Sequence, residues 1–255
     1  MRQLELPVAY NLVECNEVED LRTTAIEYAL EGAPEGTLIW AANQVNAKGW
    51  LGQNWICKPG DLHCSIILRP EFEPKQYPEL FLVSAVSLAH ALATHLSAMT
   101  ALGFGWPNDV TIAGHKVASI WIDCDMQASS VWMSITASVN LLSSPQDISL
   151  HAISVKDVEG ETGLTAAVLL EAYARQFVSQ INQWSSHGLE YIVRQWKIRD
   201  YGKGKDKTIR LQRGEFFGVQ QQVGSSGELE LKLPNGTVEI VFLEEYLNHI
   251  SLQEN

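Results

Sequence analysis

The stretch that decides the fold is residues 105–121, which read GWPNDVTIAGHKVASIW. It contains two short runs typical of β-strands, residues 109–113 and 117–121, joined by Gly114-His115-Lys116. A turn that begins with glycine between two such runs predicts a β-hairpin. Asp109 opens the first run and Lys116 precedes the second, so a carboxylate and an ammonium group could converge on one side. Two interpretations stay open: a plain hairpin in which Asn108-Asp109 starts a turn, or a hairpin that carries the charges of a functional site.

The composition is that of a folded chain with an acidic surface. The chain has 255 residues, of which 46% are hydrophobic and 19% are charged, so it can bury a sizeable core. Its net charge of −12 at pH 7 argues against nucleic acid as a partner. No apolar run approaches the ~20 residues needed to span a bilayer, and the first residues lack the pattern of a signal peptide. These observations predict a cytoplasmic protein without a membrane partner.

The cysteines indicate neither a metal site nor a disulfide framework. The chain has four of them, Cys15, Cys57, Cys64 and Cys124. Since no two form a Cys-x-x-Cys pair, we predict free thiols and no metal bound by the protein. Cys124 lies between Asp123 and Asp125, and neighbouring carboxylates raise the pKa of a thiol, so nucleophilic catalysis by Cys124 is disfavoured.

The first part of the chain is predicted to alternate helices and strands. Residues 1–16 are expected to form an irregular or extended arm. A helix is predicted over residues 18–31, with Asn16 as its N-cap and Gly32 at its end. Strands are predicted over residues 38–42, 62–68 and 131–137. The apolar stretch 79–102 predicts a long helix that covers one face of the sheet.

The rest of the chain is predicted to be helical first and then β-rich. After a loop over residues 143–161, helices are predicted over residues 166–184, capped by Thr162 or Thr165, and 189–196. Four short strands separated by glycine-rich turns follow, over residues 208–211, 216–223, 229–233 and 238–243. We therefore predict an α+β fold, with a mixed β-sheet packed by helices over residues 1–203 and a small C-terminal β-barrel over residues 204–255.

Four segments, taken in order, carry a resemblance to a known family. They are QVNAKGWLGQNW at residues 44–55, Trp106-Pro107-Asn108-Asp109, Gly114-His115-Lys116-Val117-Ala118, and Ala137-Ser138-Val139-Asn140-Leu141. They resemble the adenylate-binding loop, the WPND motif, the GxKxAG segment with its essential lysine, and the GxGxN segment of the biotin protein ligase family, within the biotin/lipoate ligase superfamily. The resemblance covers nearly the whole chain. It implies a class II synthetase-like catalytic domain and an SH3-like C-terminal barrel, without the DNA-binding N-terminal domain of some members.

The resemblance also implies a reaction in two steps. The carboxylate of biotin attacks the α-phosphate of ATP to give biotinyl-adenylate and pyrophosphate, and a lysine of a carrier domain then displaces AMP. Lys116 would bind the biotin carboxylate and the α-phosphate. Asp109 would orient the incoming lysine and accept its proton, or hold Mg²⁺ indirectly. Biotin, ATP and Mg²⁺ are thus the expected ligands, a carrier protein the expected partner, and a homodimer the expected assembly.

Ten further residues are expected at the ligands on the same ground. They are Gln44, Lys48, Gly49, Trp50, Gly52, Trp55, Trp106, Asn108, Ala118 and Asn140. Gln44 and the backbone of Lys48-Gly49 would contact biotin, and Asn140 would lie near the adenine or the ribose.

The sequence departs from the family in the adenylate-binding loop. The family's loop reads GRGRRGR, whereas residues 47–53 here read AKGWLGQ, which keeps both turn glycines but only one basic residue, Lys48. Each lost cationic hydrogen bond to an adenylate would weaken binding by roughly 1.5–3 kcal/mol. Stacking of Trp50 on adenine would partly compensate for this loss; alternatively, Trp50 is a core or lid residue.

Three functions therefore stay open from the sequence. The first is an active biotin–carrier ligase, and the second is a non-catalytic ligase-like protein that binds biotin, an acyl cofactor or a protein. The third is a lipoyl or octanoyl transferase, against which the chain has neither an Arg-Arg-x-Ser-Gly-Gly-Gly run nor a suitably placed cysteine nucleophile.

Overall fold

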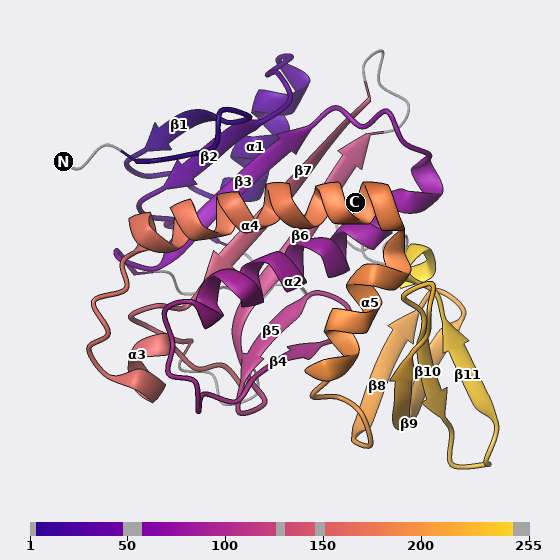
Figure 1. Ribbon diagram of the computed structural model, residues 1–255. Helices are drawn as coiled ribbons and strands as arrows, with labels where there is room; N and C mark the ends of the chain where they lie inside the picture. The colour runs from indigo at the N-terminus through magenta and orange to yellow at the C-terminus, as the bar shows by residue number, and fades with distance from the viewer. Residues whose placement is uncertain (1–3, 48–57, 126–130, 146–150, 247–255) are drawn as a thin grey trace.

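The computed structural model describes residues 4–47, 58–125, 131–145 and 151–246. Its larger sheet has the strand order β1-β2-β3-β7-β6-β5-β4 (Figure 1). The bounds are β1 Asn11–Cys15, β2 Thr37–Ala41, β3 Leu62–Leu68, β4 Leu102–Gly105, β5 Asp109–Ile112, β6 His115–Asp125 and β7 Trp132–Val139. Strand β1 pairs with β2 in parallel and the other neighbours pair antiparallel, so the sheet is mixed, as predicted.

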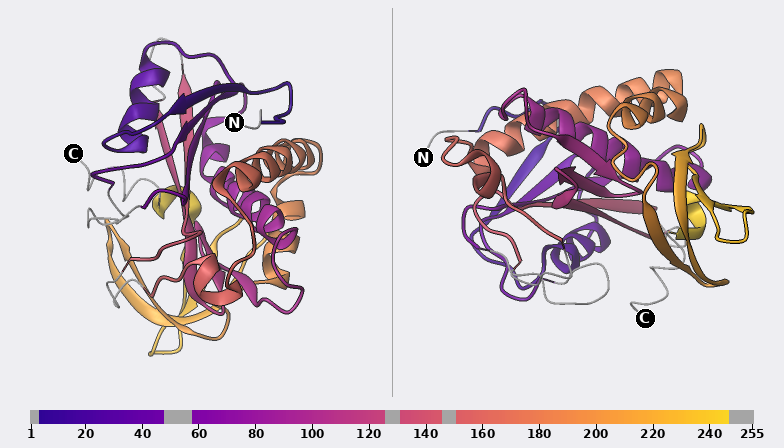
Figure 2. Two further views of the ribbon diagram at one scale, coloured as in Figure 1. Left: turned by 90° about the vertical axis from the view of Figure 1, so that its left-hand side faces the viewer. Right: turned by 90° about the horizontal axis from the view of Figure 1, so that it is seen from below.

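Helices cover both faces of this sheet. On one face lie α2 (Leu80–Ala93) and α4 (Ala166–His187), with α5 (Leu189–Ile198) beside them, and on the other lies α1 (Leu21–Leu30) (Figure 2). Two short elements, η1 (Pro74–Glu79) and α3 (Val155–Glu159), precede α2 and α4 respectively. Helix α2 is apolar almost all round because it lies between the sheet and α4.

The two faces of the sheet differ in chemistry because side chains alternate along each strand. In β7, Met133, Ile135, Ala137 and Val139 join the main core under α2 and α4. The opposite face, which we call the polar face, carries His63, Ser65, Asp109, Thr111, Ser119, Trp121, Asp123, Ser134, Thr136 and Ser138 from strands β3, β5, β6 and β7. Helix α1 covers part of the polar face through a small separate cluster of apolar side chains.

The C-terminal part of the chain forms a second, antiparallel sheet in the order β11-β10-β9-β8. Its strands are β8 Asp206–Leu211, β9 Gly214–Val223, β10 Leu229–Lys232 and β11 Val238–Val241. Within the described residues these strands form an open sheet and do not close into the predicted barrel. Ile209, Leu229 and Val241 belong to the same hydrophobic cluster as the main core, so this sheet packs directly on the rest of the protein. A domain boundary at residues 203–204 remains a prediction.

The prediction was wrong about the end of α2. The helix expected over residues 79–102 ends at Ala93, and strand β4 begins at Leu102. At the helix end the Thr94 hydroxyl donates to the carbonyl of Ala91 at 2.7 Å, a local bond that competes with a further helical turn. The sequence misleads here because Leu92, Leu96, Met99 and Leu102 continue a helical spacing of apolar residues, although Met99 is exposed in the structure.

Caps and loops account for the smaller differences. Asp20 rather than Asn16 caps α1, because its Oδ1 accepts a hydrogen bond from Thr23 N at 2.9 Å. Thr165, one of the two predicted residues, caps α4. Strand β1 lies within the predicted arm, and α3 lies within the predicted loop over residues 143–161. No helix in the described part of the chain is long and apolar enough to cross a bilayer.

Candidate functional site

Strands β5 and β6 form the hairpin that the sequence predicts. Ile112 pairs with His115, so Ala113 and Gly114 make a two-residue turn. Both have positive φ, 50° and 84°, as a type I′ turn requires. Gly114 is also required by a close approach, since a Cβ at this position would come within 1.8 Å of a ring atom of Tyr201. The turn thus brings the hairpin against the segment that leads into the C-terminal sheet.

A β-bulge sets the direction of the Lys116 side chain. Asp109 pairs with Ser119 and Thr111 pairs with Lys116, so Val117 is one extra residue in β6. In a regular strand Lys116 and Ser119, three positions apart, would lie on opposite faces of the sheet. The extra residue places both of them on the polar face, beside Asp109.

Lys116 and Asp109 form an ion pair there, as their convergence in the sequence suggested. Lys116 Nζ lies 3.0 Å from Asp109 Oδ2, and the two side chains are 23% and 22% exposed. Ser119 Oγ donates to the other carboxylate oxygen, Asp109 Oδ1, at 2.5 Å. Each carboxylate oxygen therefore has a partner, and the ammonium group remains within reach of an incoming anion.

The backbone around Lys116 is fixed by the segment before α3. Lys116 N donates to His151 O at 2.8 Å, and Ile153 N donates to Lys116 O at 2.9 Å. Asn140 Nδ2 donates to the carbonyl of Ile153 at 3.2 Å. Asn140 is only 2% exposed, so in this structure its side chain ties the end of β7 to the segment that holds Lys116.

A cleft of about 280 Å³ lies beside the ion pair, between the hairpin and the C-terminal sheet. Its lining residues include Asp109, Lys116, His151, Tyr201, Lys205, Asp206 and Lys207. The Lys205 ammonium group lies over the ring of Tyr201, 2.8 Å from its centroid. The lining of the cleft thus carries three ammonium groups and two carboxylates.

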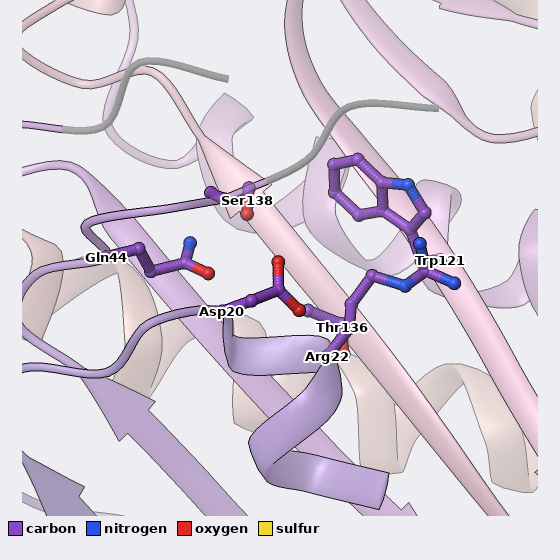
Figure 3. A pocket seen from close by; sticks show the side chains of 7 residues that line it. Asp20, Arg22, Gln44, Trp121, Thr136 and Ser138 are labelled. Atoms are coloured by element: carbon purple, nitrogen blue, oxygen red, sulfur yellow. The ribbon is translucent and has the colours of Figure 1, made fainter. Parts of the chain in front are cut away.

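A second hollow lies on the polar face near the start of α1 (Figure 3). It is lined by Asp20, Arg22, Gln44, Ala47, Trp121, Thr136 and Ser138. Its volume is about 10 Å³, which is room for about one water molecule. Gln44, a predicted ligand-binding residue, is oriented here by α1, because its Oε1 accepts a hydrogen bond from Leu21 N at 2.8 Å. We call this space the head hollow.

An ion pair fixes α1 over the head hollow. Arg22 donates to Asp123 through Nε at 3.1 Å and through Nη2 at 2.7 Å, and both side chains are largely buried. A two-point contact of this kind holds both position and orientation. The first turn of α1 is therefore attached to the middle of β6, next to Trp121.

The cleft and the head hollow lie near each other on the polar face, separated by the pairing of strands β5, β6 and β7. Ser138 lines the hollow and pairs with Ser119, which in turn pairs with Asp109 in the cleft. Directly opposed residues lie about 5 Å apart, so two such steps separate the spaces by about 10 Å. An elongated molecule on the polar face could reach both.

The other predicted ligand-binding residues fall into two groups. Trp106, Asn108 and Ala118 are at most 3% exposed and hold the hairpin in place. The Asn108 Nδ2 group, for example, donates to Ile120 O at 2.9 Å. The second group, Lys48, Gly49, Trp50, Gly52 and Trp55, lies outside the described residues and stays a prediction.

The structure adds residues that the sequence analysis missed. Arg22, Thr136 and Ser138 line the head hollow, and Ser119 fixes Asp109. The sequence did contain a signal for Thr136 and Ser138: polar side chains recur at every second position of residues 134–138, with apolar ones between them. Arg22 carried no such signal, because an arginine in the first turn of a helix is most often exposed.

Burial controls the titration of His63 on the polar face. His63 is 1% exposed, its Nδ1 lies 3.1 Å from Ser138 Oγ, and its Nε2 has no hydrogen-bond partner among the described residues. Burial lowers the pKa of His63 to about 4, although the nearby Asp61 carboxylate acts in the opposite direction. The imidazole is therefore neutral at pH 7.

Neither a reactive thiol nor a metal cluster is part of the described site. Burial, followed by Asp123 and Asp125, raises the pKa of the Cys124 thiol to about 11, which agrees with the argument against a nucleophilic role. Cys15, Cys64 and Cys124 are free thiols. In residues 4–47, 58–125, 131–145 and 151–246, no group of three His, Cys, Asp or Glu side chains could hold a metal ion.

Comparison with known sequences identifies related proteins. Residues 52–198 match the family model described as the biotin/lipoate A/B protein ligase family. The bifunctional ligase/repressor BirA of Bacillus spizizenii is 27% identical over 236 residues, which cover 90% of this chain and 72% of that protein. A biotin–[acetyl-CoA-carboxylase] ligase of Paracoccus denitrificans is 27% identical over 203 residues, 78% of this chain and 85% of that one.

Solved structures share the fold at low sequence identity. The biotin protein ligase of Aquifex aeolicus in complex with biotin and ATP has a TM-score of 0.78 and 19% identity, covering 92% of this chain and 97% of its own. A biotin protein ligase-like protein of unknown function from Silicibacter sp. has a TM-score of 0.77 and 18% identity, covering 96% and 99%.

Proposed function

Because the chain belongs to the biotin/lipoate A/B protein ligase family, we propose that it activates a biotin-type carboxylic acid with ATP and transfers the acyl group to a lysine of a carrier protein. The observation that carries this proposal is the Lys116–Asp109 ion pair, which lines the cleft on the polar face, two strands away from the head hollow. An ammonium group and a carboxylate at that point suit the two steps of such a reaction.

In the first step, one carboxylate oxygen of the acid attacks the α-phosphorus of ATP. A carbon–oxygen–phosphorus link forms, and the bond from the α-phosphorus to the bridging oxygen breaks to release pyrophosphate. Catalysis of such a step depends on placing the two reactants and neutralising charge on the phosphate oxygens. Lys116 supplies a positive charge for this purpose, and the biotin-type head would lie in the head hollow beside Gln44.

In the second step, the amine of a carrier lysine attacks the acyl carbon and AMP leaves. The attacking amine must lose a proton, and Asp109 is the carboxylate placed to accept it. Ser119 holds that carboxylate in one orientation. Mg²⁺ would arrive with the phosphates of ATP, since this ion is bound by substrate phosphates and one or two carboxylates, of which the cleft offers Asp109 and Asp206.

One observation favours a second candidate for the acid. The head hollow has room for about one water molecule and is lined mainly by polar side chains, including Gln44, Thr136 and Ser138. An acid with a smaller, hydrogen-bonding head group would fit it with less rearrangement than the two fused rings of biotin. The acid is therefore to be found by testing several, and a homodimer and a cytoplasmic location stay predictions.

The test is ATP–pyrophosphate exchange, which reports the first step without a carrier. Biotin, lipoic acid, octanoic acid and short acids with amide or hydroxyl groups are supplied one at a time. We expect one of them to support exchange and Lys116→Ala to reduce kcat by about 100-fold to 1,000-fold, the usual effect of removing one group that stabilises transition-state charge. Lys75→Ala is the matched control, because Lys75 is an exposed lysine on η1 that pairs with the exposed Glu73.

Three results would contradict the proposal in different ways. Absence of exchange with every acid would reject catalysis, and calorimetric binding of biotin without exchange would leave a non-catalytic binding protein. Acyl transfer from an acyl carrier to a lipoyl domain without ATP would identify a transferase instead.

A further inference from the structure

The C-terminal sheet touches the turn that carries Asp109. That turn, Trp106-Pro107-Asn108, connects β4 to β5, and Gly105 pairs with Asp109 across it. The position of the Asp109 backbone therefore depends on how these three residues are held. Two side-chain hydrogen bonds hold Trp106, and both of them reach across to the C-terminal sheet.

The first bond comes from Lys207 at the start of β8. Lys207 Nζ donates to the carbonyl of Trp106 at 2.9 Å. Burial lowers the pKa of the Lys207 ammonium group, and Lys116 acts in the same direction, whereas the Asp109 and Asp200 carboxylates oppose both. Lys207 is thus close enough to Asp109 and Lys116 for its charge to interact with both of theirs.

The second bond runs the other way, from Trp106 to the C-terminal sheet. The indole Nε1 donates to Gly227 O at 2.8 Å, and Trp106 is 2% exposed. The ring also makes an edge contact with Tyr246, with 5.2 Å between centroids. Gly227 itself has a positive φ of 80°, and a Cβ there would lie 2.6 Å from Leu243 and 3.0 Å from Leu82, so this turn packs closely on the core.

We infer that the C-terminal sheet is a working part of the acid-activation site, in which Lys207 is a positioning residue that fixes the Trp106-Pro107-Asn108 turn and hence the Asp109–Lys116 pair. The inference rests on the proposed function. It assigns the sheet a role in the first step, before any carrier is bound, rather than a role in carrier docking alone.

Further contacts make the C-terminal sheet a rigid support. Phe104 in β4 pairs with the segment that leads into that sheet, through Phe104 N to Arg199 O at 2.9 Å and Tyr201 N to Phe104 O at 3.1 Å. Gln220 in β9 then donates to Asp200 at 2.8 Å. The sheet also shares the main hydrophobic cluster, so a displacement of Lys207 would be resisted by packing on several sides.

The test compares Lys207→Met with Lys207→Arg in the full chain, using ATP–pyrophosphate exchange. We expect Lys207→Met to lower kcat by about 10-fold to 100-fold, because displacement of a reacting group by 1 Å has effects of that size. The KM values for the acid and ATP should change much less, and Lys207→Arg should restore most of kcat. Lys232→Met, an exposed lysine on β10 of the same sheet, is the matched control.

A second variant and a second measurement separate positioning from folding. Trp106→Phe keeps the ring but removes the bond to Gly227, and it should lower kcat in the same way. Deuterium uptake by the amides of residues 105–112 should rise in Lys207→Met and not in Lys232→Met. Uptake by the amides of α2 should stay unchanged in both variants, which shows that the core remains folded. This measurement needs no activity, so it remains decisive if no acid supports exchange and the proposed function fails.

Three results would overturn the inference. The first is that Lys207→Met keeps the wild-type kcat of ATP–pyrophosphate exchange while its KM for the carrier rises. This result would make the C-terminal sheet a docking module. The second is unchanged deuterium uptake in residues 105–112. A loss of kcat that Lys207→Arg does not restore counts against it as well.

Discussion

The two faces of the larger sheet are built by the same strands and serve opposite purposes. Under α2 and α4 the strands present Met133, Ile135 and Ala137 to a continuous apolar core. One residue along, Ser134, Thr136 and Ser138 lie on the polar face. The first face gains stability from the removal of apolar surface from water, whereas the second gives up part of that gain by burying hydrogen-bonding groups, as the proposed ligand site requires. The alternation of side chains along one strand thus places the apolar core on one face and the candidate site on the other.

The largest effect on stability is expected from the apolar face. Ile135 is fully buried in the main core, so Ile135→Ala removes apolar contacts and leaves a cavity. We expect a loss of about 2–5 kcal/mol in the free energy of unfolding, measured by urea denaturation followed by circular dichroism. Exchange activity at 10 °C should be retained by the folded fraction. A loss below 1 kcal/mol would show that this face is less tightly packed than the structure indicates.

The next effect is a dependence of stability on pH that comes from the polar face. Since burial lowers the pKa of His63 to about 4, the unfolded chain, with a histidine pKa near 6.5, binds the proton first as the pH falls. The contribution of His63 to the free energy of unfolding is therefore fully present above about pH 6.5. It is lost as the pH falls from 6.5 to 4, by up to about 3 kcal/mol.

The variant His63→Gln isolates this contribution, because it leaves all other titrating groups in place. Unfolding curves of both proteins at pH 7, 6, 5 and 4 should show the wild type losing stability faster. Parallel pH profiles for the two proteins would mean that the pKa of His63 is the same in the folded and the unfolded chain.

The smallest effect is expected next to Ile135, at Ser134. Its hydroxyl is buried and has no hydrogen-bond partner among the described residues. Ser134→Ala should therefore change the free energy of unfolding by less than about 1 kcal/mol, in the stabilising direction, because it removes a polar group that loses its water on folding. Thermal unfolding at pH 7 measures this. A clear destabilisation would reveal a partner for this hydroxyl.

Much of the architecture could be predicted from the sequence, since it depends on local patterns. The alternation in β3, the apolar run of α2 and the glycine-led turn at Gly114 each identify an element from neighbours in the sequence. The Asp109–Lys116 contact was also within reach, because so short a hairpin places Lys116 opposite Thr111, only two residues from Asp109. The end of α2 was not, since apolar residues at Leu96, Met99 and Leu102 continue the helical spacing beyond the residue where the helix ends.

The sequence by itself determined the hairpin, its two charges, most of the helices and strands and the family. Only the tertiary structure decided that a bulge at Val117 turns Lys116 to the polar face, that Arg22 attaches α1 to Asp123, and that Lys207 holds Trp106. The physical reason is the range of the interactions. Periodicity, caps and turns act between residues a few positions apart, whereas register and these two contacts depend on how the sheet and its covering elements pack together.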